Sequence, residues 1–128
     1  MVTTAPSHEV TRNVRLGEIY FAIGGFWKLE QMRAFLDELI NAAAPIVKQR
    51  TPIRVLGEME GFLAQDRQTG AAIRDHLMMS QKYGLQRVAI VSAPALVKLQ
   101  YSRLSQGIEV EFCDSKMQAL VWLRRPSG

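Results

Sequence analysis

The sequence predicts a single α/β domain whose sheet is mixed but mostly parallel. Short apolar runs of strand type alternate with segments in which apolar residues recur every three or four positions, as in amphipathic helices. Single helices between successive strands imply right-handed crossovers and a parallel arrangement of those strands, so about five strands and about four helices are expected. Two strands separated by Gly17-Glu18 come before this alternation and predict an antiparallel N-terminal hairpin at the edge of the sheet.

The first half of the chain contains the hairpin and the longest helix. The expected strands cover residues 10–16 and 19–23, and the second of them ends at Gly24-Gly25. The following helix has apolar residues at three- and four-residue steps, with polar residues on its other face. Pro45 is expected to kink or end this helix because proline lacks an amide donor.

The second half repeats strand and helix with clear boundary signals. Gly84 suits the left-handed cap at the end of a helix, and Pro94 suits the first turn of one. Asp114 or Ser115 can cap the final helix. The expected strands lie at residues 53–56, 87–92 and 108–112, and the expected helices at residues 71–83, 94–104 and 115–123.

The composition is that of one globular domain. The chain has 128 residues, 48% of them hydrophobic and 22% charged, which is enough for one sizeable core. Residues 1–8 are small and polar, so we expect a flexible N-terminal tail followed by a single domain over residues 9–125. Neither a membrane span nor a secretion signal is expected. Cys113 is the single cysteine, which excludes an intrachain disulfide and favours a cytoplasmic location.

The charge pattern argues against nucleic acid as a partner. The net charge is +4, from 16 basic and 12 acidic residues, and the basic residues are spread over several predicted elements. The longest basic run is Arg124-Arg125, whereas nucleic-acid-binding surfaces usually carry a clustered basic stripe with interleaved aromatic residues. The basic residues are therefore interpreted as a solvated surface.

Five stretches resemble the SpoIIAA-like family of the STAS superfamily, which is named for sulfate transporters and anti-sigma-factor antagonists. The ending VEFCDSKMQALVWL, residues 110–123, is the most specific of them. None of the stretches is catalytic, so the resemblance implies a fold and a protein-binding regulatory role in bacteria rather than a reaction. The other four stretches are GGFWKLEQM (24–32), MEGF (59–62), Asp75 and RVAIVS (87–92).

The resemblance also points to the start of the second helix as a regulatory position. In the anti-sigma-factor antagonists, a partner kinase phosphorylates a serine there, within an Asp-Ser-Ser-Gly or Asp-Ser-Ala-Gly pattern. In this chain no serine follows Asp66, and Thr69 is the only nearby hydroxyl. A phosphate at Thr69 would meet free amides and the positive end of the helix dipole, so Thr69 is a candidate phosphorylation site. The favoured interpretation is a threonine that caps the helix.

Large apolar residues gather where the parallel strands are expected to end. Phe26, Trp27 and Phe62 all follow strands, and ligands of open parallel sheets bind beyond the carboxyl ends of the strands. Exposed there, these rings would grip a hydrophobic ligand or a partner surface. In the alternative interpretation, the same rings are buried against the helix ends.

The remaining reactive residues form no recognisable catalytic or metal-binding pattern. Glu58 and Glu60 share one side of an extended backbone, but a third ligand and a nucleophile are lacking nearby, so solvated acids are favoured. His76 has no second histidine or cysteine at metal-binding spacing, and Cys113 is interpreted as a small buried residue. Dinucleotide and phosphate-loop motifs are absent. Neither a metal nor a cofactor is expected.

Two functional hypotheses of different classes follow. The first is a non-enzymatic regulatory or protein-binding domain, whose contact surface includes the loop 58–70 with Asp66 and the corner at Phe26 and Trp27; it rests on the resemblance. Self-association as a homodimer belongs to the same hypothesis, because an edge strand offers unpaired backbone groups. The second is a small carrier that binds an apolar or lipid-like ligand near Phe26, Trp27 and Phe62 at the carboxyl edge of the sheet. An enzyme is not expected.

Overall fold

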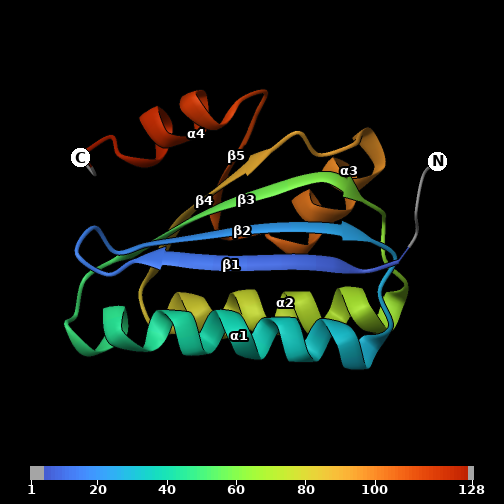
Figure 1. The fold of residues 1–128 in the computed structure, drawn as a ribbon, viewed down its shortest axis with the longest axis horizontal. Helices are drawn as coiled ribbons and strands as arrows, with labels where there is room; N and C mark the ends of the chain where they lie inside the picture. The colour runs from blue at the N-terminus through green and yellow to red at the C-terminus, as the bar shows by residue number, and fades with distance from the viewer. Residues whose placement is uncertain (1–4, 127–128) are drawn as a thin grey trace.

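The structure, a computed structural model that describes residues 5–126, has the expected α/β architecture (Figure 1). Five strands form one mixed sheet in which the strand order equals the chain order. The first two strands pair antiparallel, and all further pairings are parallel. The predicted fold class is confirmed. The elements are β1 (Ser7–Asn13), β2 (Glu18–Gly25), α1 (Leu29–Lys48), β3 (Ile53–Phe62), α2 (Arg67–Lys82), β4 (Leu85–Val91), α3 (Ala95–Leu104), β5 (Glu109–Cys113) and α4 (Lys116–Leu123).

The helices cover the two faces of the sheet unequally. α1, α2 and α3 lie on one face, where they share with the sheet a large hydrophobic core that includes Phe21, Leu77 and Val97. α4 alone lies on the opposite face (Figure 1). There it packs against the central strands in a smaller cluster formed by Leu56, Ala89, Val91, Ala119 and Leu123.

The hairpin begins earlier than the expected strands. β1 starts at Ser7, so Ser7 and His8 belong to the sheet rather than to the tail expected over residues 1–8. Residues 1–4 of that tail lie outside the described part of the chain. The ring of His8 lies 5.8 Å from the ring of Phe35 in α1. This contact adds to the backbone pairing of all of β1 with β2, which forms the strand despite its polar sequence.

Helix α1 continues through Pro45 to Lys48, contrary to the expectation that the proline could end it. Proline provides no amide for the carbonyl of Asn41, four residues earlier. The guanidinium of Arg12 in β1 donates to that carbonyl and to the next one, at 3.4 Å in each case. The carbonyl left free by the proline thus becomes a link between α1 and the edge strand.

An ion pair between a buried glutamate and a half-exposed arginine fixes the end of α4 to β2. Glu18 is almost fully buried, and both of its carboxylate oxygens accept hydrogen bonds from Arg124 at 2.9 Å. These hydrogen bonds from Arg124 hold the pKa of Glu18 below its ordinary value, against the effect of burial. The hydroxyl of Tyr20 also donates to Glu18, and Arg87 of β4 donates to the carbonyl of Trp122. The short helix is therefore held at its end by two strands.

We predict that Gly57→Ala destabilises the protein by about 1–3 kcal/mol, the usual effect of overpacking a core. A Cβ atom at Gly57 would lie 2.1 Å from the ring of Phe21, which crosses the strand at that point. Urea unfolding measures the difference. Gly61→Ala in the same strand is the matched control, because the nearest atom to its Cβ is the Cα of Gly24 at 3.9 Å. Equal unfolding midpoints for the two variants would contradict this packing.

Candidate functional site

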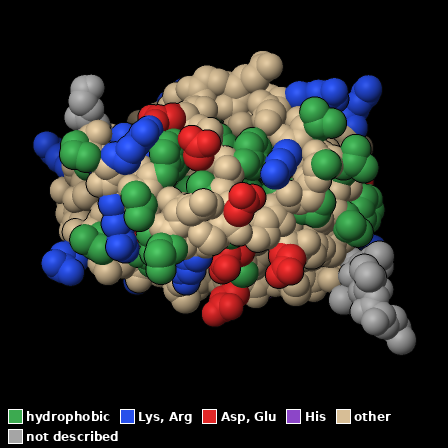
Figure 2. Space-filling model, turned by 90° about the horizontal axis from the view of Figure 1, so that it is seen from above, with side chains coloured by type: hydrophobic (Ala, Val, Ile, Leu, Met, Phe, Trp, Pro, Cys, Tyr) green, Lys and Arg blue, Asp and Glu red, His purple; other side chains and the backbone are tan. Residues whose placement is uncertain are grey.

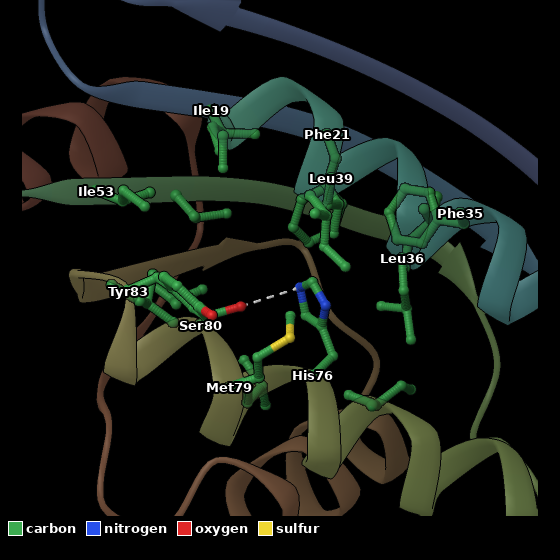
Figure 3. A pocket seen from close by; sticks show the side chains of 18 of the residues that line it. Ile19, Phe21, Phe35, Leu36, Leu39, Ile53, His76, Met79, Ser80 and Tyr83 are labelled. Carbon is green, nitrogen blue, oxygen red and sulfur yellow. Dashed lines mark hydrogen bonds between the residues drawn. The ribbon is translucent and has the colours of Figure 1, made fainter. Parts of the chain in front are cut away.

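The candidate site is an apolar cavity of about 460 Å³ between helices α1 and α2 and the sheet (Figure 3). Its walls come from β2, β3 and β4 on one side and from the two helices on the other, with Tyr101 of α3 as a further lining residue. The volume lies within the range of about 300–1,000 Å³ that is usual for small-molecule sites. The lining is almost entirely hydrophobic, so the cavity is suited to an apolar ligand.

The sizes of the α1 side chains explain where the cavity is closed and where it opens. Met32 and Phe35, in the first half of α1, are buried and fill the space beside the sheet. In the second half the lining residues include the small Ala43 and Ala44. The lining residue Tyr83, just beyond the end of α2, is 60% exposed. The open lip of the cavity therefore lies beside the C-terminal halves of α1 and α2.

This location differs from the one expected for a carrier. The C-terminal halves of α1 and α2 lie near the amino ends of the parallel strands, because each helix runs back across the sheet to start the next strand. Ile53 and Leu85, the first residues of β3 and β4, line the cavity. The accessible apolar space is therefore at the opposite end of the sheet from the carboxyl edge.

Two polar side chains of α2 enter this apolar space. Figure 3 shows the ring of His76 pointing from the helix into the cavity, one turn before Ser80. The Nε2 atom of His76 and the hydroxyl of Ser80 are 3.4 Å apart. The other ring nitrogen, Nδ1, is buried and has no hydrogen-bond partner among residues 5–126. Burial lowers the pKa of His76 below its ordinary value, with a smaller opposing effect of Asp37, so the ring is neutral at pH 7.

The aromatic residues expected at the carboxyl edge are divided between core and surface. Trp27 is 1% exposed, its ring lies against those of Phe35 and Phe62, and its Nε1 donates to the carbonyl of Gly24 at 2.8 Å. Phe62 is also buried and lines the closed end of the cavity. Only Phe26 of the three is exposed. Burial against the helix ends, the alternative interpretation, thus describes Trp27 and Phe62.

The acidic residues singled out by sequence do not converge. Glu58 is partly buried and Glu60 is exposed. Asp66, and not Thr69 as expected, is the N-cap of α2, because the helix begins already at Arg67. The Asp66 carboxylate accepts the N–H of Thr69 at 2.8 Å, which lowers the pKa of Asp66. Thr69 itself is fully buried, so a kinase would reach its hydroxyl only after the start of α2 had opened. Among the described residues no three acidic, histidine or cysteine side chains are grouped as metal ligands.

Gln65, a residue that sequence reasoning passed over, holds the loop before α2 in place. Its side-chain carbonyl accepts the N–H of Trp27 at 2.9 Å, and its amide donates to the carbonyl of Gly25 at 3.3 Å. The side chain of Gln100 in α3 bonds both the N–H and the C=O of Gln65, each at 2.8 Å. The polar stretch that looked like a recognition loop is therefore anchored to the end of β2, to Trp27 between β2 and α1, and to α3.

The sequence contained one usable signal for the polar part of the cavity. His76 and Ser80 are four residues apart and share a helix face with Ile73 and Leu77, both buried. A histidine and a serine among buried apolar neighbours indicate a polar pair inside the protein.

Comparison with known proteins identifies the fold. No protein-family model and no curated protein matches the chain. The crystal structure of an uncharacterised protein of the DUF3478 family from Shewanella loihica PV-4, described as having a SpoIIAA-like fold, matches with a TM-score of 0.62. The two sequences are 22% identical, and the match covers 96% of this chain and 98% of that one. The chain therefore has the SpoIIAA-like fold that its motifs indicated.

None of the helices formed by residues 5–126 is both long enough and apolar enough to cross a bilayer.

We predict that acidification below pH 6.5 destabilises the protein through His76. Because burial lowers the pKa of His76 in the folded state from 6.5, the unfolded chain binds a proton that the folded chain does not. The stabilisation is therefore complete above pH 6.5 and is lost as the pH falls toward the lower folded-state pKa. Urea unfolding at a series of pH values measures this slope.

The matched variants for this prediction are His76→Phe and Met79→Leu. His76→Phe removes the titrating group and should flatten the slope, whereas Met79→Leu changes a neighbouring lining residue and should keep it. A slope that survives in His76→Phe would assign the pH dependence to other groups.

Proposed function

We propose that this domain is a non-enzymatic binding protein that holds a small apolar molecule in the cavity between α1, α2 and the sheet. The cavity itself carries the proposal. Protein interiors are close-packed, with few voids larger than a water molecule, so an apolar space of about 460 Å³ with an open lip is suited to a ligand. The lone cysteine favours action in the cytoplasm, and the likeness to a Shewanella protein favours a bacterial setting.

The arrangement of His76 and Ser80 supports binding rather than nucleophilic catalysis. A serine nucleophile needs a histidine base that is itself oriented by a third group, usually a carboxylate on the other ring nitrogen. Within residues 5–126, Nδ1 of His76 has no such partner. The separation of 3.4 Å between the imidazole and the hydroxyl is also long for a proton transfer.

The test is titration of the protein with N-phenyl-1-naphthylamine, an uncharged apolar dye that fluoresces in dry surroundings. We expect saturable binding of one dye per chain with Kd of about 1–10 μM, a modest affinity for a small apolar ligand. Ala43→Phe should abolish it, because the new ring projects into the open half of the cavity.

The matched control is Ala34→Phe on the same helix. Ala34 is exposed and does not line the cavity, so this variant should bind the dye as the wild type does. Absence of saturable binding, or equal binding by both variants, would contradict the proposed function.

A protein-binding role is the second candidate, and exposed apolar side chains on α4 favour it. Met117 is 78% exposed and Val121 is 70% exposed, and their spacing places both on one side of the helix. Figure 2, viewed from the α4 side, shows hydrophobic side chains at the surface among charged ones. Such a strip is suited to a second copy of the chain or to another protein.

Light scattering over a range of concentrations tests self-association through this strip. Self-association through this strip is supported if the wild type is a dimer and the double variant Met117→Ser, Val121→Ser is a monomer. Leu96→Ser with Leu99→Ser on α3 is the control, because it removes an equally exposed apolar pair elsewhere. A monomer at every concentration would exclude the homodimer and leave only other proteins as partners.

A further inference from the structure

We propose that the cavity takes a single-chain amphiphile, and that His76 and Ser80 bind its hydroxyl or undissociated carboxyl group. This inference rests on the proposed function and adds to it the chemical class of the ligand. It comes from three observations: an unpaired nitrogen on a ring that points into the cavity, the apolar surroundings of that ring, and the elongated shape of the space.

The first observation is a hydrogen-bonding group that lacks a partner. Nδ1 of His76 is buried, and none of residues 5–126 hydrogen-bonds to it. A buried polar atom without a partner is destabilising, and a ligand that supplies the partner removes this penalty on binding. The ring points into the cavity (Figure 3), so a ligand there lies against the ring, and a rotation of the side chain brings Nδ1 to the ligand.

The second observation restricts the chemistry of the ligand group. In a neutral imidazole one nitrogen donates and the other accepts, and the Ser80 hydroxyl does both. A ligand hydroxyl or protonated carboxyl group also donates and accepts, so it pairs with either tautomer of His76. Beside His76 and Ser80 a charged group is disfavoured, because the neighbouring walls are apolar and Lys48, the charged lining residue, lies at the far end of α1 by the open lip.

The third observation restricts the shape of the ligand. Lining residues on α1 run from Met32 to Lys48, which is about 24 Å at 1.5 Å per residue. Those from α2 and its C-cap run from Ile73 to Tyr83, about 15 Å on the same scale. His76 and Ser80 lie between the closed end near Phe62 and the exposed lip. An unbranched chain can therefore fill the closed end while its polar group meets the two side chains.

The first experiment compares two probes of equal chain length, 1-decanol and decane, by displacement of the naphthylamine dye. The measured quantity is the ratio of the decane Kd to the 1-decanol Kd in each protein variant. A change in the affinity of the cavity for hydrocarbon affects both Kd values alike, so it leaves this ratio unchanged. We expect His76→Phe to lower this ratio about tenfold, the equivalent of about 1.4 kcal/mol for one lost hydrogen bond. Ser80→Ala should lower it less, because Nδ1 remains.

Asp75→Asn is the matched control on the same helix. Asp75 is exposed and does not line the cavity, so the ratio should equal that of the wild type. Circular dichroism and thermal unfolding verify that each variant is folded.

The second experiment needs no change at His76. Long-range proton–nitrogen spectra resolve the ring nitrogens of the two histidines, and His8→Gln identifies those of His8. We expect 1-decanol to shift the Nδ1 resonance of His76, and decane at saturation to leave it unchanged.

The outcomes separate this inference from the proposed function. If neither probe displaces the dye and the dye itself does not bind, both proposals are wrong. A different outcome is that both probes bind, the Kd ratio in His76→Phe equals that of the wild type, and 1-decanol does not shift the Nδ1 resonance. The cavity then binds hydrocarbon without a polar contact, and only this inference is wrong.

Discussion

The handedness of the crossovers is the constraint on which the rest of this structure depends. Strand order follows chain order, so β2 to β3, β3 to β4 and β4 to β5 are steps in the same direction across the sheet. Right-handed connections made in one direction place all their helices on one face. α1, α2 and α3 must therefore share a face, and α4, which is not a crossover, is the only described helix that covers the other. The large core, the cavity inside it and the small second cluster all follow from this division.

Within the crowded face, the helices are fixed at one end and loosely packed at the other. Gln65, in the loop before α2, joins the segment between β2 and α1 to the middle of α3 through hydrogen bonds of 2.8–3.3 Å. The rings of Trp27, Phe35 and Phe62 fill the space beneath it. Toward the other end, small alanines on α1 leave the cavity unfilled. The same pair of helices thus provides both a rigid closed end and an accessible lip.

The sequence was sufficient for the fold and insufficient for the site, for physical reasons that particular residues illustrate. Alternation of apolar runs, Gly84 and Ser115 are local signals, and local signals determine where strands and helices begin and end. Whether Trp27 is a rim or a core residue depends on the position of α1 over the sheet, which no local pattern encodes. The polar character of Gln65 resembles that of any loop residue until its hydrogen-bond partners are placed around it. The cavity arises because some lining side chains are too small to fill the space between the helices and the sheet. The periodicity of a helix predicts which residues face the sheet, but it does not predict whether they fill that space.

The separation of α4 from the other helices has a consequence for the chain during synthesis. Each strand pairs with the strand made just before it, so β1 to β5 and their three helices can assemble in the order in which they leave the ribosome. Leu56, Ala89 and Val91 stay uncovered throughout, because the residues that cover them begin only at Lys116. A nascent chain arrested just before that point presents a nearly finished sheet with one bare apolar stripe. Chaperones and proteases recognise surfaces of that kind. The eight residues of α4 cover this stripe, so the chain stops presenting such a surface only when α4 has been made and has packed.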